Sequence, residues 1–375
     1  MSVSKAEMTD MAFKPDSPLA NSPVLTGGAL ESDLWSFGGA GGLSMTWGYD
    51  SAAHGQMLEL YDKGKQRQWD ADTRLDWSEE LDPDNPMQLS EQLIPLWGSP
   101  LWERLSAAER AQIQLHTQAH TISQFLHGEQ GALIAASRAV QSMPNLDAKF
   151  FAATQVMDEA RHTEVYARLL KEKFPVRYPI DASLKNLLHD GLSASDWDMA
   201  LLTMQVLVEN VALASFQRIR NNSKANLATA VNAYVMQDEA RHVAFGQRVL
   251  RNYYKQLSSA ERAQREEFVI ESYNQIRAGY WQRAVWENLG LPADQCVRLV
   301  RESRAGDDFG QIVLRRLVPV FCEIGLWGPA LQRYFEPMGG DRFVQVDPEQ
   351  AQVEDETFVT ELDAMRAEIA MAGKA

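Results

Sequence analysis

The sequence predicts an all-α protein, and three observations carry that prediction. From about residue 50 onward the apolar residues recur mostly at helical spacing, with little of the alternation that is typical of strands. Ser-x-x-Glu capping boxes stand at Ser106/Glu109 and Ser258/Glu261, where two apolar-periodic stretches begin. Turn signals rich in Pro, Asn and Ser separate the long stretches. We therefore expect a four-helix bundle core with additional helices around it.

The expected helices follow one another along most of the chain. They span residues 50–68, 106–142, 146–172, 196–221, 224–256 and 259–288, with one or two more between 308 and 334. Residues 1–48 are rich in Gly, Ser and Pro, which favours an irregular N-terminal arm. We expect residues 49–335 to form one helical domain whose core is 107–256. Residues 336–375 would be a C-terminal tail with a short acidic helical pattern.

Charge and composition narrow the classes of function. The formal net charge is −15 at pH 7, so no basic excess is available to neutralise phosphates. We therefore expect no nucleic acid and no membrane surface as a partner. The two cysteines, Cys296 and Cys322, are too few for a disulfide scaffold and are expected to be buried thiols. We find no apolar run of signal-peptide type and no run of about 18 apolar residues, so we expect a cytoplasmic protein.

One pentapeptide, Asp-Glu-Ala-Arg-His, occurs twice in the chain, at 158–162 and again at 238–242. Residues three apart lie on one face of a helix, so Glu159 points the same way as His162, and Glu239 the same way as His242. A single Glu-x-x-His is most simply a solvated helix face. Here both pairs lie in apolar stripes, where charged groups are costly unless they are paired or bound to metal.

Two further glutamates complete the pattern. Glu129 and Glu209 are lone carboxylates in apolar stripes, and the interval 129–159 equals the interval 209–239. The midpoints of both intervals, at 144 and 224, fall on turn signals. In an antiparallel hairpin, Glu129 would therefore lie at the same height as Glu159, and Glu209 at the same height as Glu239. A Glu from each of two helices and a Glu-x-x-His from each of the other two form the ligand set of di-iron and di-manganese carboxylate bundles. We therefore predict a two-metal centre, with buried ion pairs as the alternative. The predicted ligands are Glu129, Glu159, His162, Glu209, Glu239 and His242.

With these residues, the stretch from about 107 to 256 resembles the ferritin-like di-iron oxygenase superfamily. Its members include monooxygenase hydroxylase subunits, acyl-carrier-protein desaturases, the ribonucleotide reductase small subunit and p-aminobenzoate N-oxygenase. The resemblance implies that four residues of the repeats orient the metal-bound histidines, namely Asp158, Arg161, Asp238 and Arg241. Surface charge pairs are the alternative for the two arginines.

The chain departs from three of these relatives at one position each. Val235 stands where the N-oxygenases have an additional histidine, and Leu213 where monooxygenase hydroxylases have a threonine. Glu129 stands where the reductase subunit usually has aspartate, although Tyr166 occupies the position of that subunit's radical tyrosine. A catalytic redox role for Tyr166 and simple packing in a buried stripe are both open.

The resemblance implies an O2-dependent oxygenase or oxidase, such as a monooxygenase, that acts on a small organic substrate by hydroxylation, N-oxygenation or desaturation. The cofactor would be two Fe ions, with a Mn/Fe pair as the alternative, and O2 would be the co-substrate. Because the chain has no nicotinamide or flavin motif, electrons would come from an external ferredoxin or reductase. A homodimer is a further expectation. Two other functions stay open, namely a radical generator like the reductase subunit and a ferritin-like metal-binding protein without organic substrate.

Overall fold

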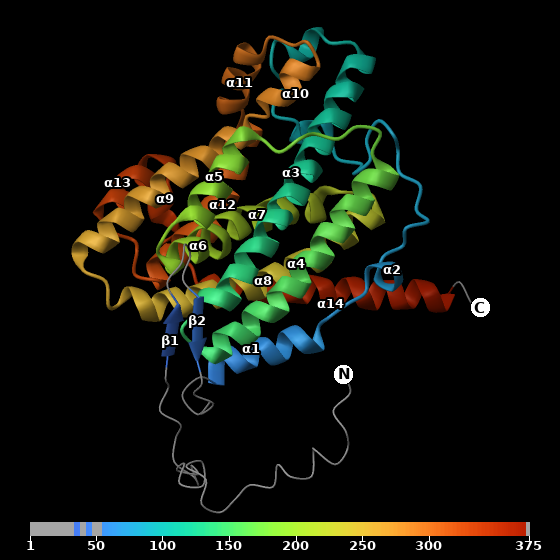
Figure 1. The fold of residues 1–375 in the computed structure, drawn as a ribbon. Helices are drawn as coiled ribbons and strands as arrows, with labels where there is room; N and C mark the ends of the chain where they lie inside the picture. The colour runs from blue at the N-terminus through green and yellow to red at the C-terminus, as the bar shows by residue number, and fades with distance from the viewer. Residues whose placement is uncertain (1–33, 38–42, 47–54, 373–375) are drawn as a thin grey trace, which may run out of the picture.

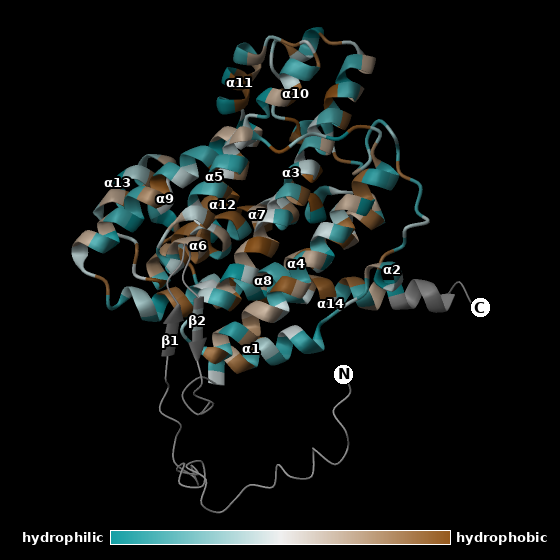
Figure 2. Cartoon of the chain, viewed as in Figure 1, coloured by the Kyte–Doolittle hydropathy of each residue, from teal (hydrophilic) through white to brown (hydrophobic). Residues whose placement is uncertain are grey.

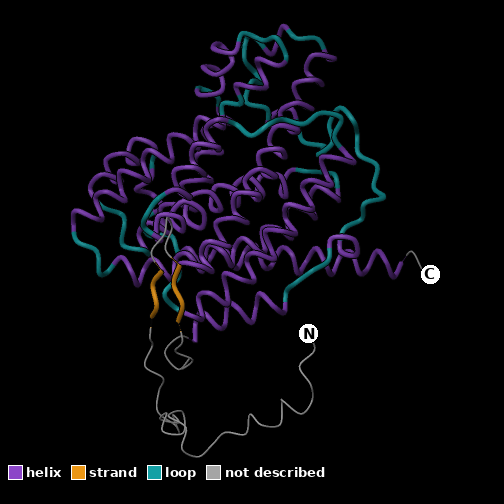
Figure 3. Tube along the Cα trace, in the orientation of Figure 1, coloured by secondary structure: helices purple, strands orange, loops and turns teal. Residues whose placement is uncertain are grey.

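The structure is a computed structural model that describes residues 34–37, 43–46 and 55–372, and it confirms the all-α prediction (Figure 1). Helices make up nearly all of its regular structure, as the coloured tube shows (Figure 3). The elements in chain order are β1 Leu34–Phe37, β2 Leu43–Thr46, α1 Gly55–Gln66, α2 Ala71–Arg74, η3 Glu91–Leu93, η4 Trp102–Arg104, α3 Ala107–Ser142, α4 Leu146–Lys173, α5 Ala182–Ser193, α6 Trp197–Leu201, η5 Leu202–Val208, α7 Glu209–Asn222, α8 Asn226–Tyr254, α9 Ser259–Tyr280, α10 Arg283–Asn288, α11 Ala293–Arg301, α12 Arg304–Glu323, α13 Pro329–Phe335, η6 Glu336–Met338, η7 Gly340–Phe343 and α14 Pro348–Ala372.

Two antiparallel hairpins form the core bundle. In the first, α3 packs along α4, and in the second α7 packs along α8. The turns fall where the sequence places them. The first lies at Asn145, whose side chain accepts hydrogen bonds from two backbone N–H groups of the first turn of α4. The second lies between Asn222 and Asn226, where α7 ends and α8 begins.

Other helices cover the bundle. Helix α1 packs on α4, α12 on α7, α5 on α9, and the long C-terminal helix α14 on α8 (Figure 1). The buried carboxylate of Asp355 fixes α14, because it accepts hydrogen bonds from Arg220 of α7 and Arg316 of α12. Figure 2 shows hydrophobic residues on α6 and on the inner sides of the central helices, with hydrophilic residues over the outer faces.

Several helices differ from the expectations. The predicted helix 259–288 is wrong as a continuous element, because Gln282 adopts a left-handed backbone (φ 49°) that separates α9 from α10. Helices α5 and α11 were not expected, and α14 is 25 residues long rather than a short helical pattern. The expected helix 50–68 is described from Gly55 onward, and residues 50–54 lie outside the described part.

The segment expected to be irregular contains a short β-hairpin. Strand β1 pairs antiparallel with β2, from Leu34 opposite Thr46 to Phe37 opposite Leu43. The two strand sequences flank a Gly-Gly-Ala-Gly-Gly stretch, a composition that favours chain reversal. Ser44 attaches the hairpin to the α3–α4 turn, since its hydroxyl donates to the carbonyl of Met143 (2.7 Å) and its carbonyl accepts from Lys149 Nζ (2.8 Å). The rest of residues 1–54 lies outside the described residues.

One helical stretch of the described residues, Trp197–Asn222, is long and apolar enough to cross a membrane by those two criteria alone. Of its most apolar window, 83% is buried inside the fold, as it is in the core helix of a bundle. Both cysteines are free thiols, Cys296 buried and Cys322 half-buried.

Candidate metal centre

Six side chains from the four core helices converge inside the bundle. Glu129 comes from α3, Glu159 and His162 from α4, Glu209 from the start of α7, and Glu239 and His242 from α8. All six are buried. Their ligand atoms form two groups, in each of which the atoms lie within 4.8 Å of one another. One group is Glu129, Glu159, His162 and Glu239, and the other is Glu159, Glu209, Glu239 and His242. Glu159 and Glu239 belong to both groups, as bridging carboxylates would.

Glu209 follows directly on a π-helical segment, η5, which the sequence did not predict. A π-turn leaves carbonyls without their usual α-helical partners. The side-chain amide of Asn210 compensates, since its Nδ2 donates to the carbonyls of Gln205 (3.3 Å) and Val206 (2.8 Å). The π-helical segment precedes Glu209, whereas the α7–α8 turn follows it. The segment therefore leaves unchanged the number of residues between Glu209 and the turn, and Glu209 stays at the height of Glu239.

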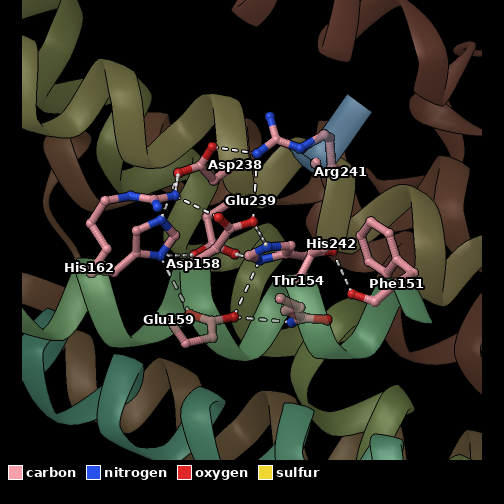
Figure 4. A network of polar contacts seen from close by, with 12 residues as sticks. Phe151, Thr154, Asp158, Glu159, His162, Asp238, Glu239, Arg241 and His242 are labelled. Carbon is pink, nitrogen blue, oxygen red and sulfur yellow. Dashed lines mark hydrogen bonds and ion pairs between the residues drawn. The ribbon is translucent and has the colours of Figure 1, made fainter. Parts of the chain in front are cut away.

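Each histidine is oriented by the aspartate of the other repeat (Figure 4). His162 Nε2 lies 3.1 Å from Asp238 Oδ2, and His242 Nε2 lies 3.3 Å from Asp158 Oδ2. If each Nε2 carries the proton that it donates to its aspartate, each Nδ1 has its lone pair toward the glutamates. His162 Nδ1 lies 3.0 Å from Glu239, and His242 Nδ1 lies 3.1 Å from the other oxygen of the same carboxylate.

The two arginines of the repeats are buried beside these aspartates rather than at the surface. Arg161 Nη2 donates to Asp158 (2.5 Å) and to Asp238 (2.9 Å), and Arg241 Nη2 donates to Asp238. Two buried cations thus balance two buried anions, and the four side chains fasten α4 to α8.

The sequence did not point to two residues between α1 and α2 that join this network. Trp69 Nε1 donates to Asp238 Oδ2 (2.8 Å), and Arg161 lies over its indole ring at 4.8 Å. Gln68 donates to Asp158 Oδ1 (2.7 Å) and accepts from Arg161 (2.6 Å). Both residues are distant in the sequence from their partners. Helical periodicity gives no signal for such long-range contacts.

The residues fit a pair of metal cations. Among the described residues, Glu209 Oε2 is buried without any hydrogen-bond partner. The buried His162 Nδ1 lies 3.0–3.4 Å from carboxylate oxygens of Glu129, Glu159 and Glu239. Buried polar atoms are rarely left without a partner, and here the lone pairs of several acceptors converge on the same small volume. Carboxylate oxygens and imidazole nitrogens form the donor set that suits Fe and Mn.

The protonation of the cluster also fits displacement by a cation. Burial raises the pKa of Glu129 and Glu209, and repulsion from Glu239 adds to that rise. Burial lowers the pKa of His162 and His242, but the surrounding carboxylates outweigh it, so both pKa values stand well above the ordinary one. Without metal the cluster therefore holds extra protons, which bound cations would displace.

Tyr166 lies one turn after His162, fully buried. Its hydroxyl donates to Asn232 Oδ1 over 3.3 Å, and its ring packs on Phe125 and Phe216. Burial raises the pKa of its phenol well above the ordinary value, and the charge of Glu129 adds to that rise.

A cavity of about 260 Å³ adjoins the cluster, and Glu129, Glu209 and Glu239 lie in its wall. Most of the surface near these carboxylates is apolar, from Phe125, Ala132, Met204, Val208, Ala212 and Phe216. A polar strip includes His120, whose Nε2 lies 2.9 Å from Asp181. The wall also contains Arg218 and Tyr280. Its residues come from α3, α5, η5, α7, α8, α9, α12 and the loops before α3 and α5, which is why the sequence could not place them.

Comparison with models of known protein families gives a match over most of the chain. The model of the p-aminobenzoate N-oxygenase AurF family matches residues 51–325, well over half of the chain. No curated protein matched significantly.

Among solved structures the chain is similar to R2-like ligand-binding oxidases. A variant with an anaerobically reconstituted Mn/Fe cofactor is 16% identical, with a TM-score of 0.46, 71% of this chain covered and 94% of that one. The enzyme from Sulfolobus acidocaldarius is also 16% identical, with a TM-score of 0.43, 81% of this chain covered and 96% of that one. The family match decides the assignment. The chain belongs to the p-aminobenzoate N-oxygenase AurF family and is an oxygen-dependent oxidoreductase.

Proposed function

We propose that this protein is an O2-dependent oxygenase that oxidises a small organic substrate held beside a two-metal centre. One observation carries the proposal, namely that the apolar cavity reaches Glu129, Glu209 and Glu239 of the buried cluster. A storage protein needs an ion path but no substrate-sized apolar cavity at its metal ligands. The cavity therefore favours organic chemistry over metal storage.

The chain's own residues would bind the metals, fix their geometry and keep water away. Two ions would be held by Glu129, Glu159, His162, Glu209, Glu239 and His242, and when bound they supply the electrons and Lewis acidity for O2 activation. The buried Asp–Arg network would hold both histidines in one tautomer. Apolar walls such as Phe125 and Phe216 would exclude bulk water from the reacting group.

The metal pair is proposed as Fe/Fe, with Mn/Fe as the alternative, because the same donor set accepts both. Val235 contributes no ligand where the N-oxygenases have their additional histidine, so we propose a centre without a seventh protein ligand.

Family membership makes N-oxygenation of an aromatic amine the first reaction to test, with hydroxylation and desaturation as alternatives. We further propose an external ferredoxin or reductase as electron donor and a homodimer as the assembly.

The test is anaerobic reconstitution with Fe(II), elemental analysis, and then exposure to O2 with a panel of aromatic amines and a chemical reductant. We expect two irons per chain and O2 uptake that depends on one substrate class. The matched control is the same preparation of Glu209→Ala. If neither iron nor manganese binds in stoichiometric amounts, the centre is a buried charge network and the proposal is wrong.

A radical generator is the second candidate, because Tyr166 is buried one turn from His162 and its hydroxyl is hydrogen-bonded to Asn232. Electron paramagnetic resonance after O2 exposure separates the two functions. A tyrosyl signal that disappears in Tyr166→Phe would favour the radical role.

A further inference from the structure

The amide of Gln155 joins two of the cluster's carboxylates. Gln155 lies one turn before Glu159 on α4 and is 0% exposed. Its Nε2 donates to Glu159 Oε1 (3.0 Å) and to Glu209 Oε1 (3.0 Å), which comes from α7. An amide nitrogen carries two hydrogens, so both are used. Gln155 Oε1 in turn accepts from Gln205 Nε2 (3.3 Å) on the π-helical segment.

These contacts fix how the two carboxylates are turned. Gln155 holds the Oε1 atom of each glutamate. Within the described chain, Oε2 of Glu209 has no hydrogen-bond partner, and Oε2 of Glu159 lies 3.4 Å from His162 Nδ1. Gln155 therefore fixes the rotation of both carboxylates, and it holds Glu159 with Oε1 on the side of His242 Nδ1, which lies 3.2 Å away.

The other half of the centre has no equivalent of this amide. Gln155 lies four positions before Glu159, and the residue four positions before Glu239 is Val235, which is buried and has no side-chain donor. Gln205 lies four positions before Glu209, and the residue four positions before Glu129 is Phe125. The duplicated ligand set thus has an amide pair at only one of its two ends.

We infer that Gln155 is a positioning residue that makes the metal position of Glu209 and His242 the tighter of the two. This inference rests on the proposed two-metal centre. Ligands that are already oriented lose less conformational freedom on binding, so the pre-arranged carboxylates bind a cation more strongly. The position of Glu129 and His162 lacks this arrangement and fills second.

The test is anaerobic titration with Co(II), followed by calorimetry and by the visible absorption of the bound ion. The wild type should bind two Co(II) with distinct affinities. Gln155→Met keeps the length of the side chain and removes both donors. We expect it to weaken one equivalent about 10- to 100-fold, which is typical for loss of a ligand's hydrogen-bond partner. The spectrum of the first-bound Co(II) should change as well.

Single-position backgrounds assign the effect. In Glu129→Ala, which leaves the Glu209 position, adding Gln155→Met should weaken binding. In Glu209→Ala, which leaves the Glu129 position, the same change should alter the affinity little. Equal losses in both backgrounds, or no loss in either, would overturn the inference.

A second variant serves if Gln155→Met unfolds at a lower temperature in circular dichroism. Gln205→Met then takes its place, because it removes only the hydrogen bond that holds Gln155. Unchanged Co(II) affinity in Gln205→Met overturns the inference. Failure of the wild type to bind two Co(II) would instead refute the two-metal centre itself, so the two failures are distinguishable.

Discussion

The two halves of the centre, residues 129–162 and 209–242, have the same ligands but different surroundings. Alignment of the two Asp-Glu-Ala-Arg-His repeats also places Glu129 on Glu209. The same alignment places Gln155 on Val235 and Phe125 on Gln205. The helix before Glu209 contains a π segment, whereas α3 is α-helical through Glu129. The donors are therefore repeated, and the two metal positions differ through their neighbours.

The difference extends to the next turn of each histidine helix. Tyr166 corresponds to Gly246, and a Cβ at Gly246 would lie 2.5 Å from the Cβ of Gln205. Only glycine allows the π segment to approach α8 so closely, and that approach brings Gln205 to Gln155. On the other side the space is filled by the Tyr166 ring, which packs on Phe125 and Phe216. The half with Glu209 thus has two buried amides and, beside His242, the ring of Phe151. The half with Glu129 has the rings of Tyr166, Phe125 and Phe216, and we call it the aromatic half.

The largest expected effect comes from removing a ligand. Glu209→Ala or His242→Ala should fold but bind about one metal per chain instead of two, because each removes a donor from only one group. Loss of activity should exceed the roughly 10- to 100-fold that follows loss of an outer partner. Elemental analysis after anaerobic Fe(II) loading measures the number of bound irons. Glu129→Ala is the matched change in the other half of the centre. Full iron in both variants would contradict the ligand assignment.

The crossed aspartates give the next largest effect. Asp238→Asn should weaken the metal position of His162 about 10- to 100-fold, although Asp238 belongs to the second repeat, because its Oδ2 faces that histidine. Asp158→Asn should act in the same way on the position of His242. Co(II) titration in the single-position backgrounds measures both. If Asp238→Asn weakened Co(II) binding only at the metal position of His242, each aspartate would act on the histidine of its own repeat.

Metal affinity should fall as the solution is acidified. The pKa values of Glu129 and Glu209 are raised by burial, and those of His162 and His242 stand above the ordinary value because of neighbouring carboxylates. Raised pKa values mean that protons stay bound to higher pH, and these must leave before metal binds. Between about pH 8 and pH 6, Co(II) affinity should therefore drop, with protons released on binding.

The control for this pH dependence is Glu209→Gln, which removes one titrating group and should release fewer protons. Calorimetry in buffers of different ionisation enthalpy gives the number of protons released on Co(II) binding. Binding without proton release would contradict the protonated metal-free state.

The sequence predicts the ligand helices because two short-range rules suffice for them. Helical spacing places Glu159 with His162, and equal distance from a turn places Glu129 level with Glu159. Gln155 escapes such rules, since a glutamine in a helix is common and its partner Glu209 lies on a different hairpin. The break at Gln282 needs a left-handed backbone that no local signal requires.

Long-range docking is equally hidden. Helix α14 is fixed by Asp355 with Arg220 and Arg316, which lie on two other helices far along the chain. His116 and His120 show the same limit, because they share α3 with Glu129 but bind Tyr178 and Asp181 instead of joining the cluster. Their partners come from the segment between α4 and α5, and only the folded chain brings that segment beside α3.

The smallest expected effect is that of Tyr166→Phe, which tests whether the aromatic half is more than packing. The change removes a single long hydrogen bond to Asn232 and keeps the ring packed on Phe125 and Phe216. We expect the free energy of unfolding to fall by about 1 kcal/mol and both metals to remain bound. Denaturant unfolding and elemental analysis measure these two quantities. Asn232→Ala is the matched control, because it removes the same bond from the other side. A variant that keeps its metals but loses all turnover would show that the phenol takes part in the redox chemistry, and the difference between the halves would then be catalytic.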